Sequence, residues 1–368
     1  MPLKPVMNTL HMPVETSDDV AALLRMLREI ANEPSKSRQS ALSRDLGDHF
    51  THLACVKPEL FAPFQMELAE MSSEELKFLN VGLNDLVPLM HGASDACTEA
   101  VARRLHNNPN DYVASDMLVA IGTAGALEEV AKHARRNDCV DAYLDSGVHV
   151  PEAGPAEWRF SPQRYAIFKN TGGKVGGDDA LKDRNPIGLP LKMVLREPEF
   201  SNVTWHYVSI RTSDMPWLPN WPSSHLHLVS PRRELDWTMY FRPDECGKYG
   251  REELIVNDEY DDDGEIEEMQ RGLRKREPGK ERGFVTLRPY DDRLVYCNGH
   301  IHRTEGVEGT AGGPPIGLYP NPICPACNRL TFHAFTVTDE IRSYGDGWRS
   351  LFVCEDCYIV ACSATSSN

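Results

Sequence analysis

Four cysteines near the C-terminus have the type and spacing of a metal site. Cys324 and Cys327 form one Cys-x-x-Cys pair, and Cys354 and Cys357 form a second pair after twenty-six intervening residues. Each pair can make a tight turn whose two sulfurs converge, and two such turns close a tetrahedral four-cysteine site, which suits zinc. A filled four-cysteine site leaves no open coordination position, so we expect a structural Zn2+. Two disulfides, or thiols that merely sit in turns, are the alternatives.

The residues between the two pairs predict the β structure that would bring them together. Residues 331–337 are rich in β-branched and aromatic side chains, residues 344–347 are typical of a turn, and residues 348–353 run into the second pair. A strand, a turn and a returning strand would place the pairs side by side. We therefore predict a zinc ribbon over residues 321–368.

Two His-x-His pairs could carry a different chemistry. His225 and His227, and likewise His300 and His302, are two apart in predicted strands, so each pair could present both imidazoles to one metal ion. Such a site keeps open coordination positions, as a catalytic zinc requires. A metal-dependent hydrolase is therefore an alternative function, although no carboxylate lies at a telling spacing from either pair.

Two further groupings are interpreted as ordinary structure. His49 and His52 are three apart in a predicted helix and are expected on the surface. Cys297 and His300 could be a thiol and its base, but nothing else in the sequence supplies an oxyanion hole or an orienting group. We therefore expect a turn between two strands at this position.

Composition and charge narrow the class of protein. The 368 residues include 41% hydrophobic and 26% charged residues, as in ordinary soluble globular proteins, and the length suggests two or three domains. A formal net charge of −16 disfavours a general nucleic-acid binder, and residues 324–357 carry five acids against three basic residues. A nucleic-acid-associated zinc ribbon is kept as a second alternative. No apolar run has signal-peptide or membrane-spanning length, so we expect a soluble cytoplasmic protein without membrane contact.

The N-terminal part of the chain predicts helices. Residues 17–31 begin with a capping serine and two acids, and their apolar side chains fall on one face. Further helical patterns span residues 72–86, 94–106 and 111–136. Residues 114–136, a helix, a small-residue turn and a second amphipathic helix, resemble part of a HEAT-like repeat. We expect an α-helical domain over residues 1–155, either a plain bundle or a solenoid whose concave side binds protein.

From residue 156 onward the pattern predicts a β-rich domain. The periodicity becomes two, and the candidate strands are residues 203–210, 225–230, 237–241, 283–287 and 293–301. Residues 215–222, rich in proline and tryptophan, are expected to fold onto the sheet. Residues 257–282 hold an acidic run followed by a basic run, which we interpret as a self-compensating charged insertion. The expected fold class is α+β: a helical domain, a β-rich domain over 156–320, and the ribbon over 321–368 packed on it.

The end of the chain resembles the closing segment of the YwqG-like bacterial proteins. The resemblance lies in Gly312-Gly-Pro-Pro-Ile-Gly-Leu-Tyr-Pro320, Cys324-Pro-Ala-Cys327 with Leu330-Thr-Phe-His333, Gly345-Asp-Gly-Trp348 and Phe352-Val-Cys354. It covers about 50 of the 368 residues. Membership would imply a β-rich fold without an established activity, and some members have been proposed as immunity proteins that bind secreted toxins.

These patterns together favour a non-enzymatic protein-binding module in the cytosol. We expect Cys324, Cys327, Cys354 and Cys357 to hold the ion, and we assign no catalytic residue. An acidic protein can steer and neutralise a basic partner, so the expected partner is another protein, such as a basic toxin or effector. The role would then be that of an immunity or regulatory protein.

Overall fold

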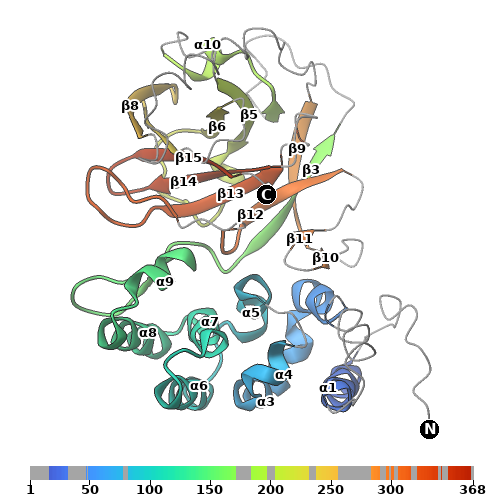
Figure 1. The fold of residues 1–368 in the computed structure, drawn as a ribbon. Helices are drawn as coiled ribbons and strands as arrows, with labels where there is room; N and C mark the ends of the chain where they lie inside the picture. The colour runs from blue at the N-terminus through green and yellow to red at the C-terminus, as the bar shows by residue number, and fades with distance from the viewer. Residues whose placement is uncertain are drawn as a thin grey trace, which may run out of the picture. The chain divides into compact units, whose positions relative to one another are not determined.

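The structure is a computed structural model with an α+β fold, as expected (Figure 1). It describes residues 16–31, 47, 49–77, 82–170, 184–196, 204–231, 238–255, 283–290, 296–297, 300–301, 306–315, 321–338, 341 and 347–365. The predicted charged insertion, 257–282, lies outside these residues. The chain divides into two compact units, Met1–Trp158 with Tyr290–Thr304, and Arg159–Pro289 with Glu305–Asn368.

The first unit is built from short helices. Their bounds are α1 Ser17–Ala31, η2 Pro58–Phe64, α3 Gln65–Glu70, α4 Ser73–Lys77, α5 Leu83–Met90, α6 Asp95–Asn107, α7 Tyr112–Ile121, α8 Ala124–Asn137 and α9 Val140–Asp145. Two small hairpins belong to the same unit: β1 Val148–His149 with β2 Glu157–Trp158, and β10 Tyr296–Cys297 with β11 His300–Ile301. Helix α6 contacts α3 on one side and α8 on the other, while α7 contacts α5 (Figure 1). The helices thus alternate between two layers; the resemblance of this order to a HEAT repeat stays a prediction.

Sequence signals fix where these helices begin and end. The side chains of Ser94, Asp111 and Thr123 accept hydrogen bonds from backbone N–H groups in the first turns of α6, α7 and α8. Helix α7 ends at Gly122, whose φ of 63° is left-handed. A Cβ atom at Gly122 would lie 2.1 Å from the ring of Trp158, so the glycine also makes room for the indole.

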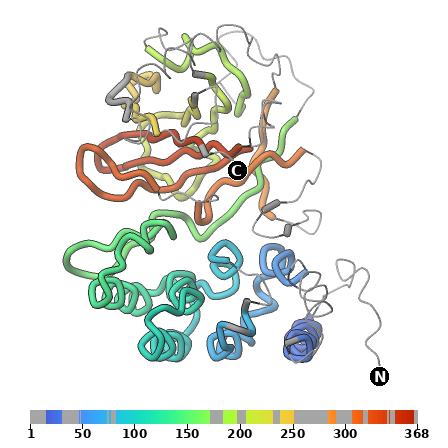
Figure 2. The backbone as a smooth tube through the Cα atoms, viewed as in Figure 1, coloured from blue at the N-terminus to red at the C-terminus, as the bar shows by residue number. Residues whose placement is uncertain are grey.

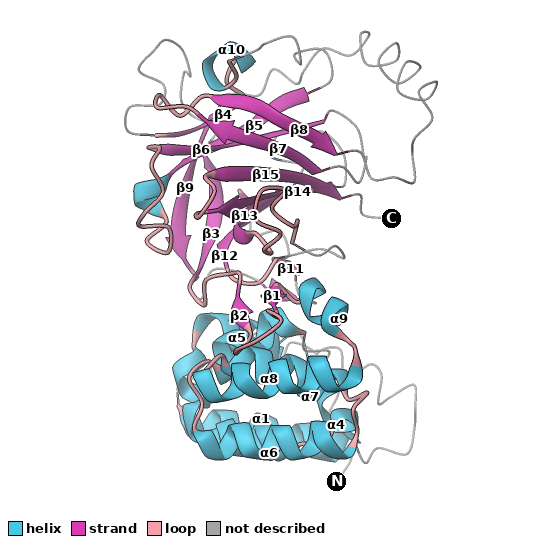
Figure 3. Cartoon of the chain, turned by 90° about the vertical axis from the view of Figure 1, so that its left-hand side faces the viewer, coloured by secondary structure: helices cyan, strands magenta, loops and turns pink. Residues whose placement is uncertain are grey.

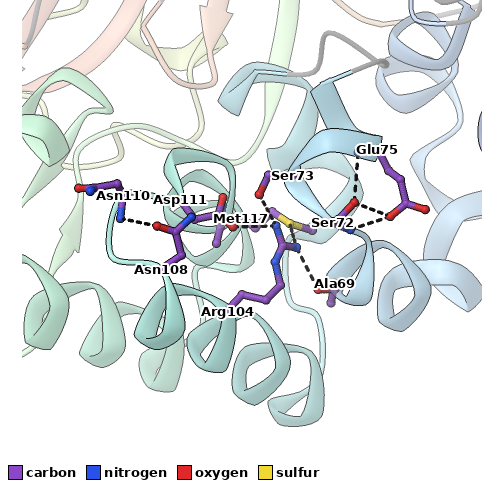
Figure 4. A network of polar contacts seen from close by, with 10 residues as sticks. Ala69, Ser72, Ser73, Glu75, Arg104, Asn108, Asn110, Asp111 and Met117 are labelled. Carbon is purple, nitrogen blue, oxygen red and sulfur yellow. Dashed lines mark hydrogen bonds and ion pairs between the residues drawn. The ribbon is translucent and has the colours of Figure 1, made fainter. Parts of the chain in front are cut away.

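A half-buried guanidinium ties four of the helices together (Figure 4). Arg104 of α6 donates to the carbonyl of Ala69 at the end of α3, to the hydroxyl of Ser73 in α4, and to the carboxylate of Asp111, which caps α7. The same side chain lies 3.6 Å from the sulfur of Met117. Arg104 therefore positions α6 against α3, α4 and α7 by charge-assisted hydrogen bonds.

The second unit is one eleven-stranded antiparallel sheet in the order β6-β5-β4-β9-β3-β12-β13-β14-β15-β7-β8. The strands are β3 Arg164–Asn170, β4 Asn185–Ile187, β5 Thr204–Arg211, β6 His225–Pro231, β7 Thr238–Pro243, β8 Tyr249–Ile255, β9 Gly283–Pro289, β12 Val307–Gly312, β13 Phe332–Thr338, β14 Trp348–Cys354 and β15 Ile359–Thr365. Edge strand β6 contacts β14 and β15, so the sheet curls back on itself. The C-terminal strands, red in Figure 2, run back and forth beside one another.

The concave side of this sheet holds the main core of the unit. Apolar side chains of β5, β6, β13 and β14 meet there with those of the predicted proline- and tryptophan-rich loop. Met215, Leu218 and Trp221 of that loop are all buried, which confirms that it folds onto the sheet. Short helix α10, Leu191–Val194, packs against the same core through Val194.

Two strand pairs of the sheet are near copies of each other. Thr204-Trp-His-Tyr-Val-Ser-Ile-Arg211 of β5 matches Thr331-Phe-His-Ala-Phe-Thr-Val-Thr338 around β13 in residue type, position by position except at Tyr207 and at the last residue. The β5–β6 and β13–β14 pairings have the same register, and both shift directly after the shared histidine, His206 or His333. Such agreement of sequence, register and bulge indicates an internal duplication.

The duplication extends to the neighbouring strands. Strand β4 ends directly before the left-handed Gly188 and β12 ends at the left-handed Gly312, and each glycine is followed two residues later by a proline. The first copy is then β3, β4, β5 and β6, and the second is β9, β12, β13 and β14. Each copy lends its first strand to the other, because β4 pairs with β9 while β12 pairs with β3. Strands β3 and β9 pair with each other, which places a pseudo-twofold axis between them.

Candidate metal centre

The two Cys-x-x-Cys pairs form the same local turn. The backbone N–H of Cys324 donates to the carbonyl of Arg329 at 2.8 Å, five residues on. Cys354 pairs likewise with the residue five positions later, at the start of β15. The residue after each second cysteine is left-handed, with φ of 57° at Asn328 and 52° at Tyr358. In each turn this reversal aims both sulfurs to one side.

The four sulfurs lie close enough together to hold one ion. Their Sγ atoms all fall within 4.8 Å of one another, and those of Cys327 and Cys354 are 3.7 Å apart. A tetrahedral zinc with Zn–S bonds of about 2.3 Å would place its sulfurs about 3.8 Å apart. The four cysteines that the sequence predicted are therefore assembled in one cluster, and no other group of this kind occurs among the described residues.

The sequence predicted a strand, a turn and a returning strand between the cysteine pairs, and the structure confirms the two strands. Strands β13 and β14 are antiparallel neighbours, and β14 continues through the second turn into β15. The predicted turn at 344–347 lies outside the described residues except for Gly347. The arrangement fits a zinc ribbon, although its strands are part of the eleven-stranded sheet.

Side chains of β7 hold the two cysteine turns in place. The hydroxyl of Tyr240 donates to the carbonyl of Ile323 at 2.9 Å, and Arg242 donates to the carbonyl of Cys357 at 3.2 Å. An ion pair between Arg329 and Asp356 joins one turn to the other. These contacts bring the sulfurs together by backbone positioning, so the cluster is preorganised for an ion.

Burial sets the acidity of these thiols. It raises the pKa of Cys354 well above its usual range and raises the pKa of Cys357 to about 11. Burial acts in the same direction on Cys327, but the N–H of Arg329 and the neighbouring thiols outweigh it and lower the pKa of Cys327. Thiolates are the ligands of zinc, so metal binding must displace protons here and will weaken as the pH falls.

The first His-x-His pair takes part in a buried hydrogen-bond chain. The N–H of Leu189 donates to Nδ1 of His206, whose Nε2 must then carry the proton and donate to Oγ of Ser209 at 2.7 Å. The hydroxyl of Ser209 donates in turn to Nδ1 of His227 at 2.7 Å, and the backbone of Gly247 accepts from the remaining ring N–H. The lone pair on Nδ1 of His227, which a metal ion would need, therefore already accepts a hydrogen bond from Ser209.

His225 lies beside His227 with the two rings parallel, at a centroid distance of 6.2 Å. Its own ring nitrogens face the hydroxyl of Ser224 at 3.0 Å and the carbonyl of Arg184 at 3.4 Å. Burial lowers the pKa of His227 to about 3, with His225 adding to the shift. Both imidazoles are thus engaged in hydrogen bonds, which disfavours this pair as a metal site.

The duplicate strand pair holds an equivalent polar cluster. His333 donates from Nδ1 to the carbonyl of Gly313 at 3.0 Å, and its Nε2 accepts from the hydroxyl of Thr336 at 2.8 Å. The hydroxyl of Ser350, which stands where His227 stands in the first copy, lies 2.7 Å from that of Thr336. Burial lowers the pKa of His333 to about 4. Sequence reasoning missed this cluster, whose only signal is the repeated aromatic-His-x-x-Ser/Thr pattern.

The remaining sequence predictions have mixed outcomes. His49 was expected on the surface but is buried, because its helical turn faces the core of the first unit, and burial with His52 nearby lowers its pKa to about 4. Cys297 of β10 pairs with His300 of β11 in an antiparallel register, so two short strands lie here and the prediction of one strand over 293–301 is wrong. Residues 298 and 299, where the turn was expected, lie outside the described residues. His302 lies outside the described residues.

Comparisons with known proteins leave the chain without an assigned relative. No family model, no curated protein and no solved structure matches it. The resemblance to the YwqG-like proteins accordingly stays a prediction. Among the described residues, the helices are all too short or too polar to cross a membrane.

Proposed function

We propose that this protein is a zinc-stabilised, non-catalytic module that binds another protein. The observation that carries the proposal is the closed set of four thiol ligands at the end of the sheet. Four cysteine ligands fill a tetrahedral ion, so the ion has no position for water or substrate and acts as a structural element. Soft thiolates in this geometry favour zinc over hard cations such as magnesium or calcium.

A basic protein is the proposed class of partner. The formal net charge of −16 gives long-range attraction to a basic surface and speeds association. The cysteine turns themselves offer little to phosphates, because Arg329 is paired with Asp356 and Arg349 is buried under Tyr207. This supports a protein partner over a nucleic acid. A toxin or effector inhibited by this chain is the concrete form of the proposal.

The metal-dependent hydrolase is the competing function, and metal stoichiometry separates the two. Elemental analysis of the purified chain should give one zinc per chain, lost on Cys354→Ser and kept on His227→Gln. Two or more metals per chain, with one lost on His227→Gln together with a hydrolytic activity, would replace the proposed function with the alternative.

The binding function has its own test. The chain is co-expressed with the products of its neighbouring genes, and complexes are sought by size-exclusion chromatography with mass detection. We expect a complex with one basic protein that dissociates as salt is raised, because its attraction is partly electrostatic. Absence of any complex, at low salt and with zinc present, would contradict the proposal.

A further inference from the structure

A groove runs between α6 and α8 on the helical unit. The two helices lie in contact in one layer (Figure 3), and the cavity between them has a volume of about 820 Å3. Small or apolar residues form its floor: Thr98, Ala102, Leu105, Leu118 and Gly125. Helices of 13 and 14 residues give the groove a length of about 20 Å. It is therefore long enough for three to four turns of another helix.

The two helices that form the groove are parallel. Arg136 near the end of α8 lies 3.1 Å from the ring of His106 near the end of α6. His133 of α8 likewise lies 3.1 Å from the carbonyl of Pro109, which follows α6. The C-terminal ends of both helices therefore meet at one end of the groove, and their N-terminal ends meet at the other.

Charge divides along the groove in the same direction. The end formed by the helix N-termini is acidic, and the opposite end is basic. The acidic residues are Asp95, Glu99, Glu128 and Glu129, and the basic residues are Arg103, His106, Lys132 and Arg136. Lys132 is held by ion pairs to both Glu128 and Glu129. Within the described part of the chain, Asp95, Glu99 and Arg103 make no ion pair, so both ends offer charge to a partner.

One buried polar group of the floor also lacks a partner. The hydroxyl of Thr98 makes no hydrogen bond, although the residue is only 6% exposed. An unpaired buried hydroxyl is costly, and a polar group on an incoming segment could satisfy it. The groove thus has a floor of small and apolar residues that lets another segment approach closely, an acidic and a basic end, and one hydroxyl without a hydrogen-bond partner.

We infer that the α6–α8 groove is the docking surface for one amphipathic helix of the partner, laid antiparallel to α6 and α8. Helices commonly carry acids in the first turn and basic residues in the last turn, because these charges suit the helix dipole. In the antiparallel orientation the acidic first turn meets Arg103 and Arg136, and the basic last turn meets Asp95 and Glu99. The inference rests on the proposed protein-binding function and names the element that the partner must supply.

The test measures the binding of designed peptides to the full-length chain. A labelled 14-residue peptide has an alanine- and leucine-rich face, two glutamates in its first turn and two lysines in its last turn. A second peptide of the same composition has one glutamate and one lysine at each end. By fluorescence anisotropy at low salt, the polarised peptide should bind at least about fivefold more tightly than the mixed one. A proline in the middle of the polarised peptide should abolish the difference.

Variants of the chain locate the binding. Arg103→Glu should weaken binding of the polarised peptide by about fivefold to tenfold. Arg25→Glu, the same charge change at an exposed side chain of α1, should leave the peptide's affinity unchanged. A photo-crosslinker at the N-terminus of the peptide should attach near the C-terminal ends of α6 and α8. Both arginines are exposed, so circular dichroism should show both variants folded like the parent chain.

Any one of the following would overturn the inference: equal binding of the polarised and mixed peptides, equal loss for Arg103→Glu and Arg25→Glu, or crosslinks at the opposite end. Full binding by the proline peptide would also overturn it, because the groove would then take an extended segment. The proposed function fails separately. If a neighbouring gene product forms a complex that Arg103→Glu leaves intact, the groove is wrong and the binding function stands.

Discussion

Lowering the pH should destabilise the β unit through two of its buried histidines, His227 and His333. Burial holds the pKa of His227 at about 3 and that of His333 at about 4, whereas an unfolded histidine has a pKa of 6.5. Because these folded-state pKa values are lowered, the unfolded chain binds more protons between pH 6.5 and about 4. The stabilisation is therefore fully present above pH 6.5 and is lost as the pH falls through that interval.

The size of the effect follows from the pKa difference. Each pKa unit corresponds to about 1.4 kcal/mol. At pH 5 a histidine is protonated in the unfolded chain but stays neutral in the folded one, so each of the two lowers the free energy of unfolding by about 2 kcal/mol. The two together should lower the free energy of unfolding by about 4 kcal/mol between pH 7.5 and pH 5. That is a large share of the total stability of a typical domain.

The assay is urea unfolding followed by tryptophan fluorescence at pH 7.5, 6.5, 5.5 and 5.0, with the metal buffered. His227→Gln and His333→Gln should each be less stable at pH 7.5, because hydrogen bonds are lost, but each should lose about 2 kcal/mol less on going to pH 5. His106→Gln, a change at an exposed histidine of α6, should follow the parent protein. If the two buried variants keep the full pH dependence of the parent, the neutral hydrogen-bond chain described above is incorrect.

Three further changes test the site and the helical unit. Cys354→Ser should release the metal, measured by elemental analysis, and lower the melting temperature, while Cys246→Ser at an exposed thiol should change neither; unchanged metal content in Cys354→Ser would contradict the four-cysteine assignment. Arg104→Met should cost the helical unit about 3 kcal/mol in urea unfolding, because the buried carboxylate of Asp111 keeps its hydrogen bond from the N–H of Ala114 but loses its cationic partner; a loss below about 1 kcal/mol would show that water reaches that carboxylate. Gly122→Ala should cost about 3 kcal/mol because the new Cβ meets the Trp158 ring, whereas Gly125→Ala has open space and should stabilise α8 slightly; equal thermal shifts for the two would refute the packing argument.

The four-cysteine cluster could be predicted from sequence because its geometry is local. Each Cys-x-x-Cys pair sets its own turn within five residues, and only the strand between the turns needs tertiary information. Strands rich in β-branched and aromatic residues, such as β5 and β13, were found for a similar reason, since their composition suits a half-buried pleated surface. These are features in which local preference and final structure agree.

The strands that sequence reasoning missed depend on their neighbours. Strand β12 contains Gly309, a residue that weakens strands, yet a Cβ there would lie 2.2 Å from the carbonyl of Thr336. The glycine is needed for close approach to β13, and this need is invisible without the pairing. Strand β15 follows the second cysteine turn directly and gains its place from β14 and β7 on either side.

The internal duplication leaves only a weak trace in the sequence and was not predicted. The matching octapeptides at 204–211 and 331–338 share few identical residues, so only the common register and bulge make the match convincing. Sequence patterning also placed His49 on a surface, because a histidine in a helix does not itself show which helix face is buried. In both cases the missing information was tertiary.

The exchange of strands between the two copies bears on how the chain is made. Strand β3 acquires its β12 neighbour only after about 140 further residues have been synthesised, and this long sequence separation predicts slow folding. Until then β3 presents an open edge on which another nascent chain could pair. On this reasoning, neither copy should be stable when it is expressed alone. A chain interrupted before β12 should become a substrate for chaperones or proteases.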